Sequence, residues 1–99
     1  MTVRTGSFAG GSIQVVQGGS ARVIRSEITH DILFDENNGA ISASRNEIGG
    51  NLQAFQNTGG VSISRNVIDG NLQCKENVPA PTGGGNIVQG EKEDQCENL

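Results

Sequence analysis

An internal repeat of 20 residues runs through almost the whole of this sequence. The segment GAISASRNEIGGNLQAFQNT at 39–58 is followed without a gap by GGVSISRNVIDGNLQCKENV at 59–78. A copy with the same apolar positions covers 19–38, a degraded copy covers 79–98, and residues 1–18 fit with one residue missing. A fixed period of this size is typical of solenoid proteins, in which each unit buries its apolar face only against its neighbours.

The pattern inside each unit predicts strands rather than helices. Apolar and polar residues alternate, and Gly-Gly and Asp-Gly pairs interrupt the alternation. We expect three short strands per unit, centred on 41–43, 47–49 and 51–55, each paired in parallel with the same strand of the next unit. The predicted fold class is therefore all-β: a right-handed parallel β-helix, a solenoid of about five coils of 20 residues.

The predicted organisation is one β-helix domain over 1–99. It consists of an irregular first coil at 1–18, three regular coils at 19–78, and a degenerate capping coil at 79–99. Fifteen Gly, three Phe and no Trp or Tyr fit this fold, because a narrow tube takes aliphatic side chains. We expect Gly to occupy corners that need a positive φ.

Both ends of the predicted rod depart from the regular coil. In the first coil we expect Phe8 to lie under Ile28. This coil has no amphipathic helix to cover it, so we expect it to continue a longer rod or to be covered by another subunit. At the other end, the Pro- and Gly-rich segment 79–85 is expected to replace the first strand with a loop. Lys92 falls in a column of Leu residues, which predicts a polar cap.

Asparagine recurs at equivalent positions of successive units. The columns are Asn37, Asn57 and Asn77; Asn46, Asn66 and Asn86; and Asn51 and Asn71. Asn tolerates the left-handed backbone region, and its amide bonds to backbone groups in turns. Stacked copies can also form hydrogen bonds along the rod axis, so we interpret the columns as structural ladders. A polar ladder that binds a ligand is the alternative.

The two Cys residues predict a disulfide. Cys74 falls in an inward column, and Cys96 follows 22 residues later, about one coil along the rod. Adjacent coils place equivalent Cα atoms about 4.8 Å apart, inside the disulfide window of about 4.4–6.8 Å. The alternative is two free thiols. A disulfide implies an oxidising compartment, and hence an extracellular or cell-surface location.

Arg25, Arg45 and Arg65 form a column of like charge. Glu27 and Glu47 lie two residues after the first two, so an exposed ion-pair lattice can form, with about 0–1 kcal/mol from each pair. The functional alternative is a row of guanidinium groups that binds regularly spaced carboxylates, as on an acidic polysaccharide. The three arginines are therefore candidate binding residues.

Phe55 and His30 are the other candidates. Phe55 has Asp35 and Lys75 as its column neighbours, so we expect it to point outward. It is either an ordinary exposed side chain or the anchor of a contact with a protein partner or a second copy. His30 replaces a corner Gly, which favours an exposed turn residue. A nucleophile–base set around His30 is the alternative.

The segment from residue 41 to the end resembles the C-terminal coils of secreted bacterial right-handed β-helix proteins of unassigned function. The motifs that carry this resemblance are IGGNLQ (48–53), IDGNLQCKEN (68–77), PAPTGGGN (79–86) and GEKEDQC (90–96). The resemblance covers roughly the last 60 residues and implies a β-helix terminus and an exported parent. It implies no activity.

Composition and charge exclude several classes of function. The net charge of −4 argues against nucleic acid, whose binders usually carry a basic stripe. No apolar run approaches the roughly 20 residues of a membrane span. Two Cys and one distant His do not make a ligand set, so we expect no metal and no cofactor. No catalytic pair of carboxylates can be assigned to one column, which argues against an enzyme.

The functional hypothesis is a non-catalytic structural or binding module, the terminal part of a secreted or cell-surface β-helix rod. The alternative is a carbohydrate-active β-helix, which either resembles a polysaccharide lyase or binds an acidic polysaccharide through the arginine column. Self-association through the uncovered first coil or through Phe55 is a further hypothesis.

Overall fold

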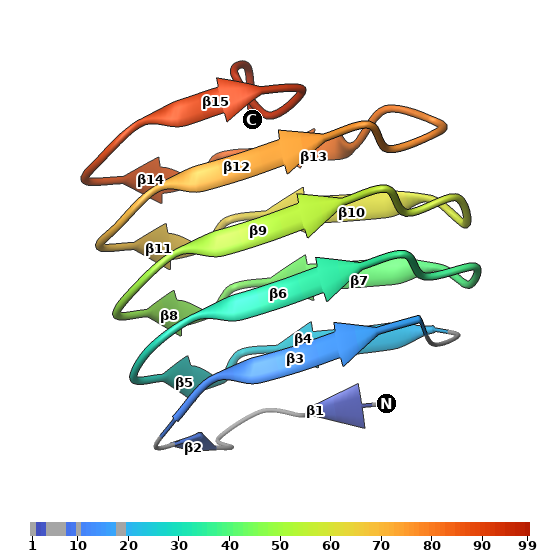
Figure 1. Cartoon of the computed structure of the whole chain (residues 1–99). Coiled ribbons are helices and arrows are strands. Elements are labelled where there is room, and N and C mark those ends of the chain that lie inside the picture. The colour runs from blue at the N-terminus through green and yellow to red at the C-terminus, as the bar shows by residue number, and fades with distance from the viewer. Residues whose placement is uncertain (1, 4–7, 10, 18–19) are drawn as a thin grey trace.

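The structure, a computed structural model of the chain, describes residues 2–3, 8–9, 11–17 and 20–99. Three parallel sheets of five strands each run along one axis and form a β-solenoid (Figure 1). The described residues contain no α-helix. This confirms the predicted class, an all-β solenoid with three short strands per unit. The hand of the solenoid and the number of complete turns stay predictions.

Each sheet is built from the equivalent strands of successive units. The first sheet consists of β1 (Thr2–Val3), β4 (Ala21–Ile24), β7 (Ile41–Ser44), β10 (Val61–Ser64) and β13 (Thr82–Gly84). The second consists of β2 (Phe8–Ala9), β5 (Glu27–Ile28), β8 (Glu47–Ile48), β11 (Val67–Ile68) and β14 (Ile87–Val88). The third consists of β3 (Ile13–Val16), β6 (Ile32–Asp35), β9 (Leu52–Phe55), β12 (Leu72–Lys75) and β15 (Lys92–Asp94).

The pairing register follows the 20-residue repeat. Strands β7 and β10 pair residue by residue, with Ile41 opposite Val61. Strands β9 and β12 pair in the same way, with Leu52 opposite Leu72. Apolar residues of equivalent positions therefore stack along the axis, and a slip of one residue would turn each strand's apolar face outward.

The prediction that Phe8 lies under Ile28 was wrong by one residue. Strand β2 pairs with β5 so that Phe8 is opposite Glu27 and Ala9 is opposite Ile28. Strand β1 still pairs with β4 at an offset of 20, so the missing residue falls between β1 and β2. A strand of two residues has too short a hydrophobic pattern to define its register in the sequence.

The expectation that segment 79–85 contains no first strand was also wrong. Residues Thr82–Gly84 form β13, which pairs in parallel with β10 and places Gly83 opposite Ile63. A parallel ladder uses backbone groups, so Gly can occupy a strand position when the neighbouring strand supplies the register. A Cβ on Gly83 would lie 1.9 Å from the Ile63 carbonyl oxygen, which shows how closely the two strands approach.

The core is a continuous cluster of apolar side chains that point inward from the three sheets. In β6 and β9 the first and third residues are buried, as alternation requires. Phe34 is the only aromatic among the buried described side chains, and the residues paired with it, Val15 and Ala54, are smaller. The small side chain of Ala54 leaves room for the ring, so the interior stays packed without a wider tube.

Two columns of turns have backbone conformations in the left-handed region. One column contains Arg25, Arg45, Arg65 and, in the last unit, Gly85. The other contains Gln17, Glu36, Gln56 and Glu76, and in the last unit Asp94, which is opposite Cys74, has a positive φ as well. The turns lead the chain from one sheet to the next, and most of these residues directly precede a buried amide side chain.

The corner glycines were expected to supply positive φ, but Gly70 does not have one. A Cβ on Gly70 would lie 2.4 Å from Asn51 Oδ1 and 2.7 Å from the Gly50 carbonyl oxygen. Glycine is needed there because adjacent units approach closely. Positive φ does occur at Gly60, where φ is 97°.

Candidate functional site

The first ladder of buried asparagines contains Asn37, Asn57 and Asn77, which follow strands of the third sheet. Asn57 Oδ1 accepts two hydrogen bonds from Asn37, from its backbone N at 3.1 Å and from its Nδ2 at 2.9 Å. Asn57 donates in the same way to Asn77 Oδ1, at 2.9 Å from both nitrogens. Asn57 Nδ2 also donates to the carbonyl oxygen of Phe34 at 3.1 Å.

The second ladder contains Asn46, Asn66 and Asn86, which follow strands of the first sheet. Asn66 Oδ1 accepts bonds from the backbone N and from Nδ2 of Asn46, both at 3.0 Å. At the far end, Asn86 Nδ2 donates to the Leu99 carbonyl oxygen at 2.9 Å. Ser26 occupies the Asn position of the earlier unit, and its backbone N donates to Asn46 Oδ1 at 2.9 Å.

These bonds confirm the structural interpretation of the two ladders. All six asparagines are buried, and within the described part of the chain every buried side-chain nitrogen and oxygen has a hydrogen-bond partner. A buried amide without a partner would cost about 1–3 kcal/mol, so this saturation stabilises the solenoid.

The third asparagine column lies at a corner, and its hydrogen bonds have the opposite direction. Here the backbone N of the later unit donates to the side chain of the earlier unit. Asn51 Oδ1 accepts a bond from the backbone N of Asn71 at 2.8 Å, and Asn71 Oδ1 accepts one from Glu91 N at 2.9 Å. Asp31 occupies the same position one unit earlier and accepts a bond from Asn51 N at 2.7 Å. This column is half-buried and also joins successive units.

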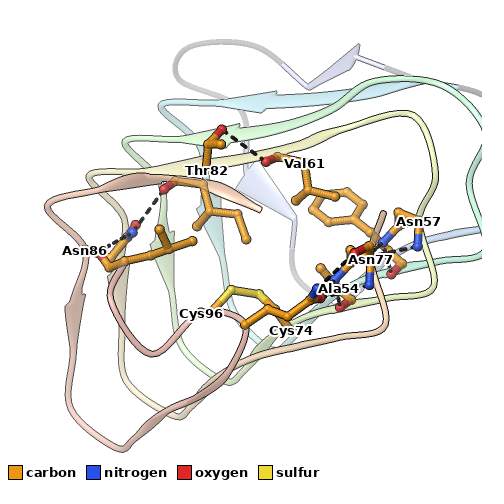
Figure 2. Close-up of a disulfide and its surroundings, with 12 residues drawn as sticks. Ala54, Asn57, Val61, Cys74, Asn77, Thr82, Asn86 and Cys96 are labelled. Atoms are coloured by element: carbon orange, nitrogen blue, oxygen red, sulfur yellow. Dashed lines mark hydrogen bonds between the residues drawn. A yellow bond between two sulfur atoms is a disulfide. The ribbon is translucent and has the colours of Figure 1, made fainter. Parts of the chain in front are cut away.

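A disulfide joins Cys74 to Cys96, with a Cα–Cα distance of 5.3 Å, as predicted. Both residues are fully buried, and Figure 2 shows the bond inside the solenoid, close to Asn77. Cys96 lies in the turn after β15, and Leu99 is buried as well, at 8% exposure. The C-terminal residues therefore cover the end of the core with apolar groups. Lys92 is opposite Leu72 as expected, and the polar cap inferred from it stays a prediction.

The candidate arginines occupy one corner of the solenoid, between the first and second sheets. Arg25, Arg45 and Arg65 follow β4, β7 and β10 directly, and all three side chains are exposed. Their backbone N–H groups donate to carbonyl oxygens of the next unit. The N–H of Arg45, for example, donates to the Ser64 carbonyl oxygen at 3.0 Å. The guanidinium groups are therefore what this row presents to solvent.

The ion-pair lattice considered for this row is not formed. Among residues 20–99, no ion pair joins Glu27 or Glu47 to the arginines. The two glutamates are exposed in β5 and β8 of the second sheet, and the arginines lie in the turns before those strands.

An open groove of about 630 Å³ lies beside Arg45 and Arg65, and Arg25 is not part of its lining. Its lining residues are Ser44, Arg45, Ser64, Arg65, Gly84 and Gly85. Sequence reasoning found the arginines but missed the serines and glycines. The recurrence of Ser at 44 and 64 was the available signal, because it places hydroxyl groups beside successive arginines.

Acidic groups surround another hollow, which lies on the second sheet. Glu27, Glu47 and Asp69 are among the residues that line its volume of about 320 Å³. No acidic residue lines the arginine groove. The arginines of the groove and the acidic residues of this hollow thus line separate surfaces of a chain whose net charge is −4.

Phe55 is half-buried at the end of β9, with Asp35 and Lys75 opposite it in the adjacent strands. Two hollows of about 330 and 450 Å³ share Phe55 and Lys75 in their lining. The ring is therefore partly accessible, and its neighbours along the column are the charged residues that the repeat predicts.

His30 is exposed in the turn after β5. Its backbone N donates to the Gly11 carbonyl oxygen at 3.3 Å. His30 therefore lies at an exposed corner, as its place in the repeat predicts.

Comparisons with family models, with curated proteins and with solved structures find no match to this chain. Over residues 2–3, 8–9, 11–17 and 20–99, no cluster of three or more His, Cys, Asp or Glu side chains could hold a metal ion. In the same residues no helix is long and apolar enough to cross a membrane.

Proposed function

We propose that this chain is a non-catalytic structural module, the terminal part of a secreted or cell-surface β-helix rod. The observation that carries the proposal is the saturation of the interior. Two asparagine ladders and a disulfide connect successive units, and within the described residues every buried side-chain nitrogen and oxygen has a hydrogen-bond partner, so the interior serves the stacking of units. A module of this kind supplies length and rigidity, because each unit contacts only its neighbours.

The disulfide supports the proposed location. A buried bond between Cys74 and Cys96 persists in an oxidising compartment and is rare in the cytosol. An antibody raised against the folded chain should detect it in the culture medium or on the surface of intact cells. Detection only inside the cells, with both thiols open to alkylation, would contradict the proposal.

A second candidate function is the binding of an acidic polysaccharide, and the groove beside Arg45 and Arg65 favours it. Arg forms bidentate hydrogen bonds with carboxylates, and none of the lining residues competes as an anion. The chain should sediment with immobilised polygalacturonate at low salt but not with uncharged dextran. Binding that is equal for both polymers would contradict this candidate.

The same polygalacturonate sample separates binding from lyase activity. A lyase forms an unsaturated product that absorbs near 235 nm, and we expect no increase in this absorbance with the purified chain. Steady turnover that disappears when Arg45 or Arg65 is replaced would overturn the non-catalytic proposal and favour the lyase-like alternative.

Self-association remains a proposal based on Phe55. The ring is half-buried beside two hollows, so it can anchor a second copy or a protein partner. The mass in solution, measured by light scattering for the parent chain and for Phe55→Ser, tests this contact. Equal concentration dependence in both chains would exclude Phe55 as the anchor.

A further inference from the structure

The arginine row has the periodicity of the solenoid itself. Ser44, which precedes Arg45, pairs with Ser64, which precedes Arg65, so the two arginines are one strand spacing apart. Ile24, which precedes Arg25, is opposite Ser44 in the same way. Adjacent strands lie about 4.8 Å apart, so cationic groups recur about every 4.8 Å along the axis.

We propose that the groove binds a linear polyanion that carries one carboxylate on every sugar ring and lies parallel to the solenoid axis. This inference rests on the second candidate function, the binding of an acidic polysaccharide. It adds the spacing of the carboxylates along the polymer, the direction in which the polymer lies, and the residues that bind it.

Turn geometry does not explain why three arginines occupy this column. Their φ values are 47°, 56° and 56°, and Gly85 occupies the same position in the next unit with φ 71°. The other left-handed column, which has similar φ values, contains only amides and acids, as at Glu36, Gln56 and Glu76. The backbone therefore accepts several side chains, and of these two columns only one carries positive charge.

The groove contains hydrogen-bond donors, and no acidic residue in its lining competes for them. The backbone N–H of Arg65 donates to the Gly84 carbonyl oxygen at 3.0 Å, and the side chain of Arg65 is exposed, so a ligand can reach its guanidinium group. Ser44 and Ser64 are half-buried in the lining, and their hydroxyl groups can bond to ring hydroxyls between successive carboxylates. Arg45 and Arg65 each present a planar fork that matches one carboxylate.

Gly84 and Gly85 keep the C-terminal end of the groove open. A Cβ on Gly85 would lie 3.4 Å from Arg65 Cγ, so the stem of Arg65 passes over this glycine. A larger residue there would narrow the groove where a polymer leaves the row. We therefore expect binding within a long chain, with affinity that rises with the number of rings and levels off after about three or four.

The test compares three soluble oligosaccharides of equal length by calorimetry at low salt, with the oxidised chain of 99 residues. Oligogalacturonate carries a carboxylate on every ring, a hyaluronan fragment carries one on every second ring, and a maltooligosaccharide carries none. We expect the first to bind most tightly, the second at least about fivefold more weakly, and the third not at all. Binding of the first should weaken as salt is raised.

The variants use the residue that the fold already accepts. Arg45→Gly and Arg65→Gly place in the row the glycine found at position 85, so the turn is preserved, and each should weaken oligogalacturonate binding about fivefold. Arg45→Lys keeps the positive charge but removes the planar guanidinium group, so it should weaken oligogalacturonate binding less than Arg45→Gly does. Arg22→Gln is the matched control, because Arg22 is exposed in β4 outside the row.

The outcomes separate the inference from the function on which it rests. Equal binding of oligogalacturonate and the hyaluronan fragment would overturn the charge-spacing inference and leave polysaccharide binding intact. No binding of either polymer would overturn both. A loss for Arg22→Gln as large as for Arg45→Gly would show attraction by overall charge and would also overturn the inference.

Discussion

Gln95 completes the ladder that Asn77 would otherwise leave open. Its Oε1 accepts a bond from the backbone N of Asn77 at 2.8 Å and one from Asn77 Nδ2 at 3.0 Å. Its Nε2 donates to the Asn77 carbonyl oxygen at 2.9 Å. The 20-residue repeat places Glu97 in this column, so the amide arrives two residues early. The longer side chain of Gln therefore takes the place of an asparagine in the last unit.

Asn57→Ala should lower the free energy of unfolding by about 3 kcal/mol. The substitution removes the acceptor for two bonds from Asn37 and the donor to the Phe34 carbonyl oxygen, all of them buried. Urea unfolding followed by circular dichroism measures the change. Asn38→Ala is the control, since Asn38 is exposed, and it should change stability by less than about 0.5 kcal/mol. Equal losses would contradict a special role of the ladder.

Gln95→Ala should cost about 1–2 kcal/mol, less than the loss at the centre of the ladder, because Gln95 is half-buried. Gln95→Asn should cost nearly as much, since the shorter side chain does not reach both groups of Asn77. The two variants can be compared by their urea midpoints. Full stability of Gln95→Asn would show that the offset of 18 residues does not require the longer amide.

Reduction of the disulfide should lower stability by about 3 kcal/mol, as estimated from the chain entropy of a loop of this length. Cys74 and Cys96 are 22 residues apart, and the bond holds the turn that carries Leu99 against the core. Unfolding with and without reductant measures the difference. Faster amide exchange should appear first at Asn86, whose backbone N donates to the Leu99 carbonyl oxygen at 3.2 Å. Unchanged exchange there would contradict the role of the bond as an anchor of the C-terminal turn.

Gly70→Ala should destabilise the chain by about 2 kcal/mol, since the added methyl group meets a backbone carbonyl and Asn51 at less than contact distance. Gly11→Ala is the matched control, because a Cβ on Gly11 has no atom within 4 Å. Thermal unfolding of the two variants provides the comparison. A stable Gly70→Ala chain would mean that the adjacent units can move apart at this corner.

The regular units could be predicted closely from the sequence. In a solenoid each residue contacts its own equivalent in the next unit, so the period along the chain is also the period in space. This is why alternation placed Leu52 over Leu72, and why spacing alone paired Cys74 with Cys96. The same reasoning placed the arginines in one column.

The irregular units could not be predicted in this way. Phe8 paired one residue away from its expected partner, and segment 79–85 formed a strand with little sequence signal for one. In both places the neighbouring unit supplies a backbone edge that determines the pairing, and an edge of hydrogen-bonding groups leaves no trace in the local pattern.

The sequence by itself determined the 20-residue period, the inward columns, the polar ladders and the cysteine pair. Only the tertiary structure decided how the last unit closes, with Gln95 and Leu99 satisfying the two ladders, and that Arg45 and Arg65 line a groove without acidic neighbours. The reason is physical: repetition transmits register from unit to unit, whereas the end of a stack and the shape of its surface depend on side chains that have no equivalent in the repeat.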